Sequence, residues 1–133
     1  MDFYNSLIKP SWTPPDWVFP AMWFTLWTLQ AVAVIVMLAS ERDGASSNAK
    51  RVAVAVFVAQ FVISIAWQAV VFGPGRLALA AVWLVGATTL VLITVVLFGR
   101  ISRVAGLLMA PTFAWMCVAT ALGWTLWKLN PAA

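Results

Sequence analysis

Four long stretches without a charged residue constrain this chain more than any other feature. Asp, Glu, Lys and Arg are absent from residues 19–39, 52–72, 77–98 and 104–127. As α-helices rising about 1.5 Å per residue, all four are long enough to cross a hydrocarbon core of about 30 Å. Their many Val and Ile residues favour strands in water, but a lone strand cannot satisfy its backbone inside a membrane. The stretches therefore predict four transmembrane helices.

The composition excludes several classes of protein. Hydrophobic residues make up 64% of the chain and charged residues 9%, against about 45–50% and about 25% in soluble domains. The net charge of +4 therefore reflects membrane topology, and we expect no nucleic-acid partner. The chain has no histidine and a single cysteine, Cys117. We therefore expect no metal site, required cofactor, disulfide or Ser-His-Asp triad. We expect Cys117 to be buried and inert.

Short connectors predict a single domain over residues 1–133, an all-α, up-down bundle of four transmembrane helices. The two connectors on one side hold more basic residues than the other side does. The first side has Arg42, Lys50, Arg51, Arg100 and Arg103, and the second has Lys9, Arg76 and Lys128. The positive-inside rule then places both termini outside the cytoplasm.

Residues 1–18 differ from the rest of the chain. They contain Pro10, Pro14 and Pro15 together with aromatic residues, which predicts a stiff, non-helical segment. No basic stretch precedes an apolar one, so the segment does not resemble a cleavable signal peptide. We expect it to lie on the end of the bundle as a lid.

Nine tryptophans fall on one side of the predicted bundle, at or above its midplane. They are Trp12, Trp17, Trp23, Trp27, Trp67, Trp83, Trp115, Trp124 and Trp127. One interpretation is a belt at the membrane interface, although ordinary belts mark both interfaces. The other is an aromatic-lined cavity for a flat hydrophobic ligand, because Trp23, Trp27, Trp67 and Trp115 lie deeper.

Two further patterns concern packing. Gln60, Ser64 and Gln68 recur every four residues, so they share one helix face. They could join helices by hydrogen bonds or provide polar anchors in the cavity. Small residues also recur every four positions, which predicts close-packing faces within the monomer or between protomers. These faces hold Gly106, Ala110 and Ala114 in the last stretch and Ala55 and Ala59 in the second.

Several motifs resemble the translocator protein family (TspO/MBR, the tryptophan-rich sensory proteins and peripheral benzodiazepine receptors). The most specific is Lys-Pro-x-Trp-x-Pro-Pro at residues 9–15. The resemblance covers essentially the whole chain. It includes Phe3-Tyr4, Leu7, Trp17-Val18, Trp23, Gln60, Ala66-Trp67, Phe72-Gly73, Leu107-Leu108, Pro111, Ala114-Trp115, Ala119-Thr120, Leu122, Trp127 and Asn130.

The resemblance implies a fold, a site and an oligomer. The family is a five-helix membrane bundle, usually dimeric, that binds porphyrins, sterol-like lipids and synthetic ligands beneath its proline-rich loop. The family's pocket positions can be assigned here by their place in the motifs, and the aromatic and polar residues described above are added to them. The implied site then comprises Tyr4, Trp12, Pro14, Trp23, Trp27, Gln60, Ser64, Trp67, Trp115 and Ala119. The implied partners are a small hydrophobic ligand and a second copy, and the implied location is a bacterial cell membrane as a multi-pass integral protein.

The chain also departs from the family pattern. It resembles a short member that lacks the first helix, and a second protomer would take that helix's place. An acidic position of the family is Trp83 here, and two asparagine positions are Ser64 and Gly123. The shape of the pocket is therefore expected to be kept better than its polar chemistry.

These observations leave three functions open. The first is binding of a porphyrin or other flat hydrophobic ligand in a sensory or carrier role. The second is enzymatic: some bacterial members degrade porphyrins in light, using tryptophans that match Trp23 and Trp115. Enzymatic chemistry is less favoured, because no general acid or base lies within the stretches and only radical or photochemical steps remain. The third is a structural or assembly subunit without a ligand.

Overall fold

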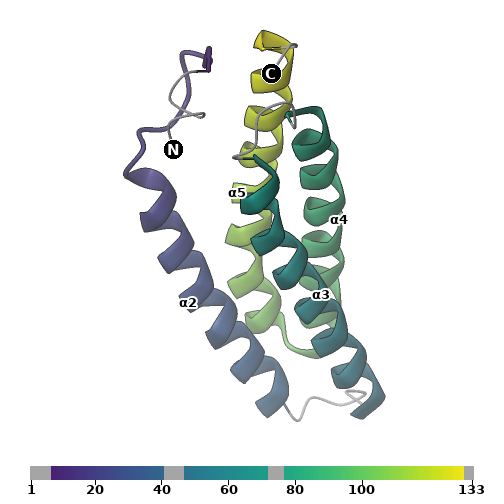
Figure 1. Ribbon diagram of the computed structural model, residues 1–133. Helices are drawn as coiled ribbons and strands as arrows, with labels where there is room; N and C mark the ends of the chain where they lie inside the picture. Colours follow the sequence, from purple (N-terminus) through teal and green to yellow (C-terminus); the bar gives the residue numbers. More distant parts are fainter. Residues whose placement is uncertain (1–6, 41–46, 72–76, 131–133) are drawn as a thin grey trace.

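The computed structural model describes residues 7–40, 47–71 and 77–130, and the side chains of all of these except 67–71. It contains four helices (Figure 1): α2 (Val18–Ala39), α3 (Ser47–Val71), α4 (Leu77–Ile101) and α5 (Arg103–Leu129). The described part of the chain contains no strand. Each helix is long and apolar enough to cross a membrane. The predicted all-α class with four membrane-spanning helices is therefore confirmed.

The helices extend beyond the uncharged stretches into polar sequence. α3 begins at Ser47 rather than at Val52, and α4 continues to Ile101, so that Ser102 alone separates it from α5. Ser102 has an extended backbone, and its hydroxyl accepts a hydrogen bond from the Ala105 amide at 3.3 Å. This is an N-cap, which satisfies one of the free amides at the start of α5.

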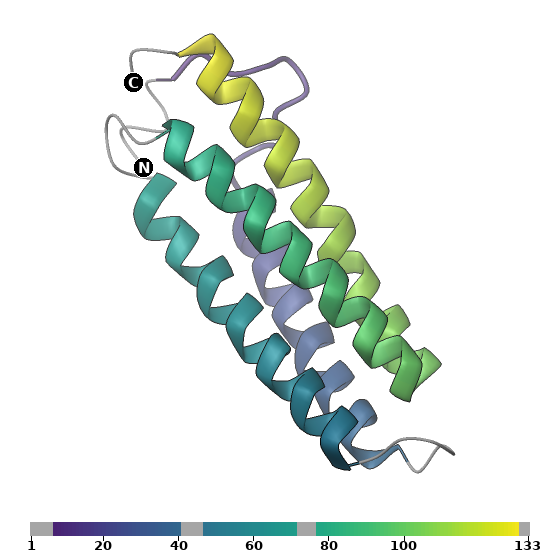
Figure 2. The ribbon, with the colours of Figure 1, turned by 90° about the vertical axis from the view of Figure 1, so that its right-hand side faces the viewer.

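The order of the helices around the bundle is α2, α5, α4, α3. α5 packs along both α4 and α2, and α3 packs along α4, whereas α2 meets α3 and α4 at few positions. The helices alternate in direction, so α2 begins and α5 ends at one end of the bundle (Figures 1 and 2). We call this the terminal end. The opposite end, which holds Lys50, Arg51, Arg100 and Arg103, is the basic end.

The basic half of the bundle is closely packed. A core of buried side chains joins all four helices there: Ala33, Met37, Ala53, Phe98, Ile101, Ala105 and Met109. The end of α2 is fixed by polar contacts as well. Lys50 donates hydrogen bonds to the Leu38 and Ser40 carbonyls at 3.0 and 2.6 Å, and Ser40 donates to the Ile101 carbonyl at 3.1 Å. A cation at these last carbonyls also complements the negative end of the helix dipole.

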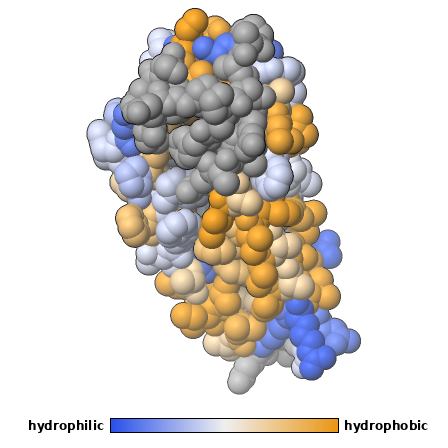
Figure 3. Space-filling view, viewed as in Figure 1, coloured by the Kyte–Doolittle hydropathy of each residue, from blue (hydrophilic) through white to orange (hydrophobic). Residues whose placement is uncertain are grey.

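The outer surface is apolar between the two ends. In Figure 3, hydrophobic side chains cover the middle of the visible face, and hydrophilic ones gather where α3 begins. Large apolar side chains such as Phe24, Ile35 and Leu107 are more than 60% exposed. Cys117 is also exposed, so its predicted burial is wrong. It directly follows the buried Met116 and is therefore turned about 100° away from the core.

The N-terminal segment lies on the terminal end of the bundle from residue 7 onward. Leu7 is buried against Leu77, Leu122 and Leu126. The Ile8 amide donates to Asn130 Oδ1 at 3.0 Å, and Asn130 Nδ2 donates to the Ile8 carbonyl at 2.9 Å. One side-chain amide thus pairs with both the backbone N–H and the backbone C=O of Ile8, as a residue of a neighbouring β-strand does, and this fixes the segment to the end of α5. These contacts place Leu7 and Ile8 against the ends of α4 and α5.

Candidate functional site

A continuous series of aromatic rings crosses from α2 through α3 to α4. Trp23 and Trp27 lie one turn apart on α2, with ring centroids 6.1 Å apart. Trp27 contacts Phe61 of α3 at 6.2 Å, and Phe61 stacks on Phe57 at 5.9 Å. Phe57 in turn stacks on Phe98 of α4 at 6.0 Å. All these separations are typical of favourable aromatic pairs.

A second aromatic contact joins α2 to α5. The rings of Phe19 and Trp115 meet edge to face at 5.9 Å. Trp23, Trp27 and Trp115 are all partly buried. The two α2 tryptophans therefore belong to one aromatic series, and Trp115 meets α2 through Phe19. We call Phe19, Trp23, Trp27, Phe61 and Trp115 the aromatic cluster.

Polar groups of α3 lie on one helix face, with Gln60 directed toward α2. Gln60 and Gln30 are both buried, and Gln60 Nε2 donates to Gln30 Oε1 at 3.1 Å. One turn further along α3, the buried hydroxyl of Ser64 makes no hydrogen bond with the described part of the chain. Gln60 thus joins two helices, whereas Ser64 retains a polar group able to anchor a ligand.

The other predicted site residues are placed less centrally. Trp12 is 49% exposed, and Pro14 is partly buried in the N-terminal segment. Ala119 packs at the α4 interface with Leu84 and Met116. Tyr4 and the side chain of Trp67 lie outside the described residues, as does that of Gln68. The structure therefore brings Trp23 and Trp27 together on α2. It also packs Trp115 of α5 against Phe19, which lies on α2 as well.

Sequence reasoning missed several members of this region. Phe19, Phe57, Phe61 and Phe98 complete the aromatic contacts but belong to none of the quoted motifs. Gln30, the partner of Gln60, is the one amide side chain in the uncharged stretch 19–39. A lone amide in a membrane helix requires a partner, and this signal could have identified it.

Two departures from the family pattern have a physical account. Trp83, at the acidic position, donates its indole N–H to the Ile63 carbonyl at 2.8 Å and so joins α4 to α3. Gly123, at an asparagine position, leaves room for Leu84. A Cβ there would lie 2.8 Å from Leu84 Cδ1. Leu84 of α4 thus occupies the space next to α5 that a polar side chain at position 123 would need.

The chemistry available around the aromatic cluster is limited. No Asp, Glu, Lys or Arg occurs within the uncharged stretches that supply it. No group of three metal-ligating side chains occurs in the described ranges 7–40, 47–71 and 77–130. The cluster offers stacking surfaces and indole N–H donors, and Ser64 on α3 adds a hydroxyl. Such groups suit the binding of an apolar ring system better than acid–base chemistry.

The chain is similar to known proteins over nearly its whole length. The profile of the TspO/MBR family matches residues 1–128. The chain is 36% identical over 131 residues to "Protein CrtK" of Rhodobacter capsulatus, covering 97% of this chain and 79% of the relative. It is 33% identical over 129 residues to "Tryptophan-rich protein TspO" of Chlorobaculum tepidum, covering 97% and 80%. It is 29% identical over 128 residues to "Translocator protein" of Homo sapiens, covering 96% and 75%. With its four membrane-spanning helices and a family profile that matches nearly its whole length, this chain belongs to the TspO/MBR family.

Proposed function

We propose that this protein binds flat hydrophobic molecules, in the first place a porphyrin or related tetrapyrrole, at the aromatic cluster between α2, α3 and α5. Sterol-like lipids are the second class of ligand. The observations that carry the proposal are the aromatic cluster and, one turn beyond Gln60 on α3, the Ser64 hydroxyl, which makes no hydrogen bond with the described part of the chain. Aromatic faces hold a planar ring by stacking, and one polar group orients it.

The names of relatives favour a sensory or carrier role over a purely structural one. One relative, 32% identical, is named "Tryptophan-rich sensory protein" and another "Translocator protein". The uncharged stretches contain no ionisable group of the kind that ion-coupled transporters place inside the membrane. We therefore propose a binding or passive carrier function that does not depend on an ion gradient.

A protoporphyrin IX titration in the dark tests this function. We expect saturable tryptophan quenching, with affinity lowered about three- to tenfold in Trp23→Phe and in Trp115→Phe, because each loses part of a stacking surface. Trp124→Phe is the matched control. Its ring contacts Trp127 at 5.3 Å near the end of α5, and we expect its affinity to remain that of the wild type.

The outcomes of the titration separate the candidate functions. Equal affinity in all four proteins would mean that the porphyrin enters the micelle or another surface, and the proposal would fail. Illumination of the bound complex under dioxygen then tests for enzymatic porphyrin degradation. A new absorbing product that depends on Trp23 and Trp115 would show that binding leads to turnover.

We further propose that the protein is a homodimer in which α3 contributes a close-packing face. Ala55 and Ala59 lie one turn apart on α3 and are both exposed, whereas Gly106 is buried against α4. Small exposed residues allow the backbones of two membrane helices to approach closely.

Mass measurement in nanodiscs tests the dimer. We expect the wild type to have twice the mass of one chain and Ala59→Leu to shift toward the monomer, because the larger side chain holds the backbones apart. Ala121→Leu, a similar change at an exposed position of α5, is expected to remain dimeric. A wild-type monomer in lipid would contradict the proposal.

A further inference from the structure

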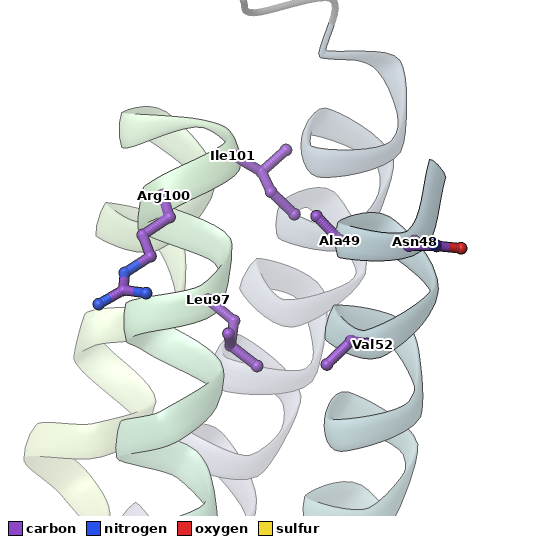
Figure 4. Close-up of a pocket in the computed structure, with 6 residues that line it drawn as sticks. All are labelled: Asn48, Ala49, Val52, Leu97, Arg100 and Ile101. Carbon is purple, nitrogen blue, oxygen red and sulfur yellow. The ribbon is translucent and has the colours of Figure 1, made fainter. Parts of the chain in front are cut away.

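A hollow lies between α3 and α4 at the basic end, away from the aromatic cluster. It measures about 290 Å³ and is lined by Asn48, Ala49, Val52, Leu97, Arg100 and Ile101. In Figure 4, Ala49 and Val52 of α3 and Leu97 and Ile101 of α4 point into the space between the helices. Its walls are therefore apolar, and the two polar residues lie at its edges.

The length of α4 indicates that the mouth of the hollow lies near the lipid headgroups. α4 has 25 residues, so at about 1.5 Å per residue it exceeds the hydrocarbon core of about 30 Å. Arg100 is next to the last residue of α4. Its charged end thus reaches the polar interface, while Leu97 lies about one turn closer to the bilayer centre.

The charge at this end is positive even with both acidic residues of the nearby connector included. Arg42, Lys50, Arg51, Arg100 and Arg103 outnumber Glu41 and Asp43 there. Of the described cations, Lys50 is engaged at the end of α2. Arg100 is exposed, and no ion pair or hydrogen bond joins its side chain to the described part of the chain. In Figure 4 it points away from α3, so it can turn over the mouth of the hollow without breaking a contact.

We propose that this hollow binds an anionic phospholipid, with the phosphate at Arg100 and one acyl chain between Val52 and Leu97. An apolar floor beneath a basic rim complements a molecule with an apolar tail below a negative headgroup. Basic hollows between membrane helices bind anionic headgroups in this way. The volume is at the lower limit of drug-sized pockets, which suits a segment of acyl chain better than a multi-ring ligand.

Native mass spectrometry of the purified, delipidated protein tests the proposal. The probes are phosphatidylglycerol and phosphatidylcholine with the same acyl chains, each added to wild type, Arg100→Gln, Arg103→Gln and Val52→Trp. We expect the wild type to retain phosphatidylglycerol preferentially. Arg100→Gln should lower this retention about fivefold, the loss expected for one basic residue at a membrane surface. Val52→Trp should lower it as well, because the indole fills the hollow.

Arg103→Gln is the matched control, because it removes one charge from the same end without lining the hollow. An equal loss in Arg100→Gln and Arg103→Gln would reveal diffuse attraction and overturn the proposal. Equal retention of both lipids, or full retention of phosphatidylglycerol in Val52→Trp, would overturn it too. The same spectra report the oligomer. If the wild type bound no lipid and Val52→Trp lost the dimer, a second copy of the chain would cover the hollow instead of a lipid.

Discussion

Replacing Gly106 by alanine is expected to destabilise the protein by about 1–3 kcal/mol, near the upper limit of that range. A Cβ at Gly106 would lie 2.7 Å from Gly99 Cα, 3.0 Å from Gly99 N and 3.3 Å from the Val95 carbonyl oxygen. All three atoms belong to the backbone of α4, so no side chain can rotate away. The methyl group would force α5 from α4 close to Ser102, where a single residue reverses the chain. The free energy of unfolding in an SDS titration, followed by tryptophan fluorescence, measures the effect.

Gly86→Ala provides the control for helix propensity. A Cβ at Gly86 meets nothing within 4 Å. The substitution is expected to be neutral or to stabilise α4 by up to about 1 kcal/mol, because alanine favours the helix over glycine. If Gly106→Ala were as stable as Gly86→Ala, α4 and α5 would not approach as closely as the structure indicates.

The course of the helices could be predicted from the sequence because a membrane imposes a simple requirement. A stretch such as 77–98 has no charge and must bond its backbone internally, so its length and composition indicate a spanning helix. The ends were harder to predict, because Ser47–Arg51 and Gly99–Ile101 are helical beyond the hydrocarbon, where charged residues are tolerated. Hydropathy falls where the membrane ends, and a helix can continue into the interface.

The candidate site could be predicted only in part. Trp23 and Trp27 were identifiable because their spacing places them on one helix face and because tryptophan is conspicuous. Phe57 and Phe61 were not, because phenylalanine is equally common on lipid-facing surfaces, and only the packing of α3 against α2 and α4 distinguishes them. Gln60 was identified as polar, but its partner Gln30 depends on the register between two helices. A single sequence does not determine that register.

Phe98→Ala is expected to lower the free energy of unfolding by about 2–3 kcal/mol. Phe98 is fully buried in the core of the basic half, where its ring stacks on Phe57 at an interplanar angle of 25°. In the cores of soluble proteins, phenylalanine-to-alanine changes cost about 3–5 kcal/mol, and part of this loss is the free energy of transferring the ring from water into the core. Lipid tails are as apolar as the core, so in a membrane protein most of this transfer free energy is absent. The cost of the cavity that the ring leaves remains.

Phe24→Ala is the matched control because it removes the same ring from the lipid-facing surface. Phe24 is 69% exposed, and its ring contacts Trp27 at 6.2 Å. Acyl chains can fill the space that the ring leaves, so we expect a loss below about 1 kcal/mol. The difference between the two variants then measures internal packing without a contribution from water. Equal losses would mean that lipid reaches position 98, which a closed core joining Met37, Phe98 and Met109 does not allow.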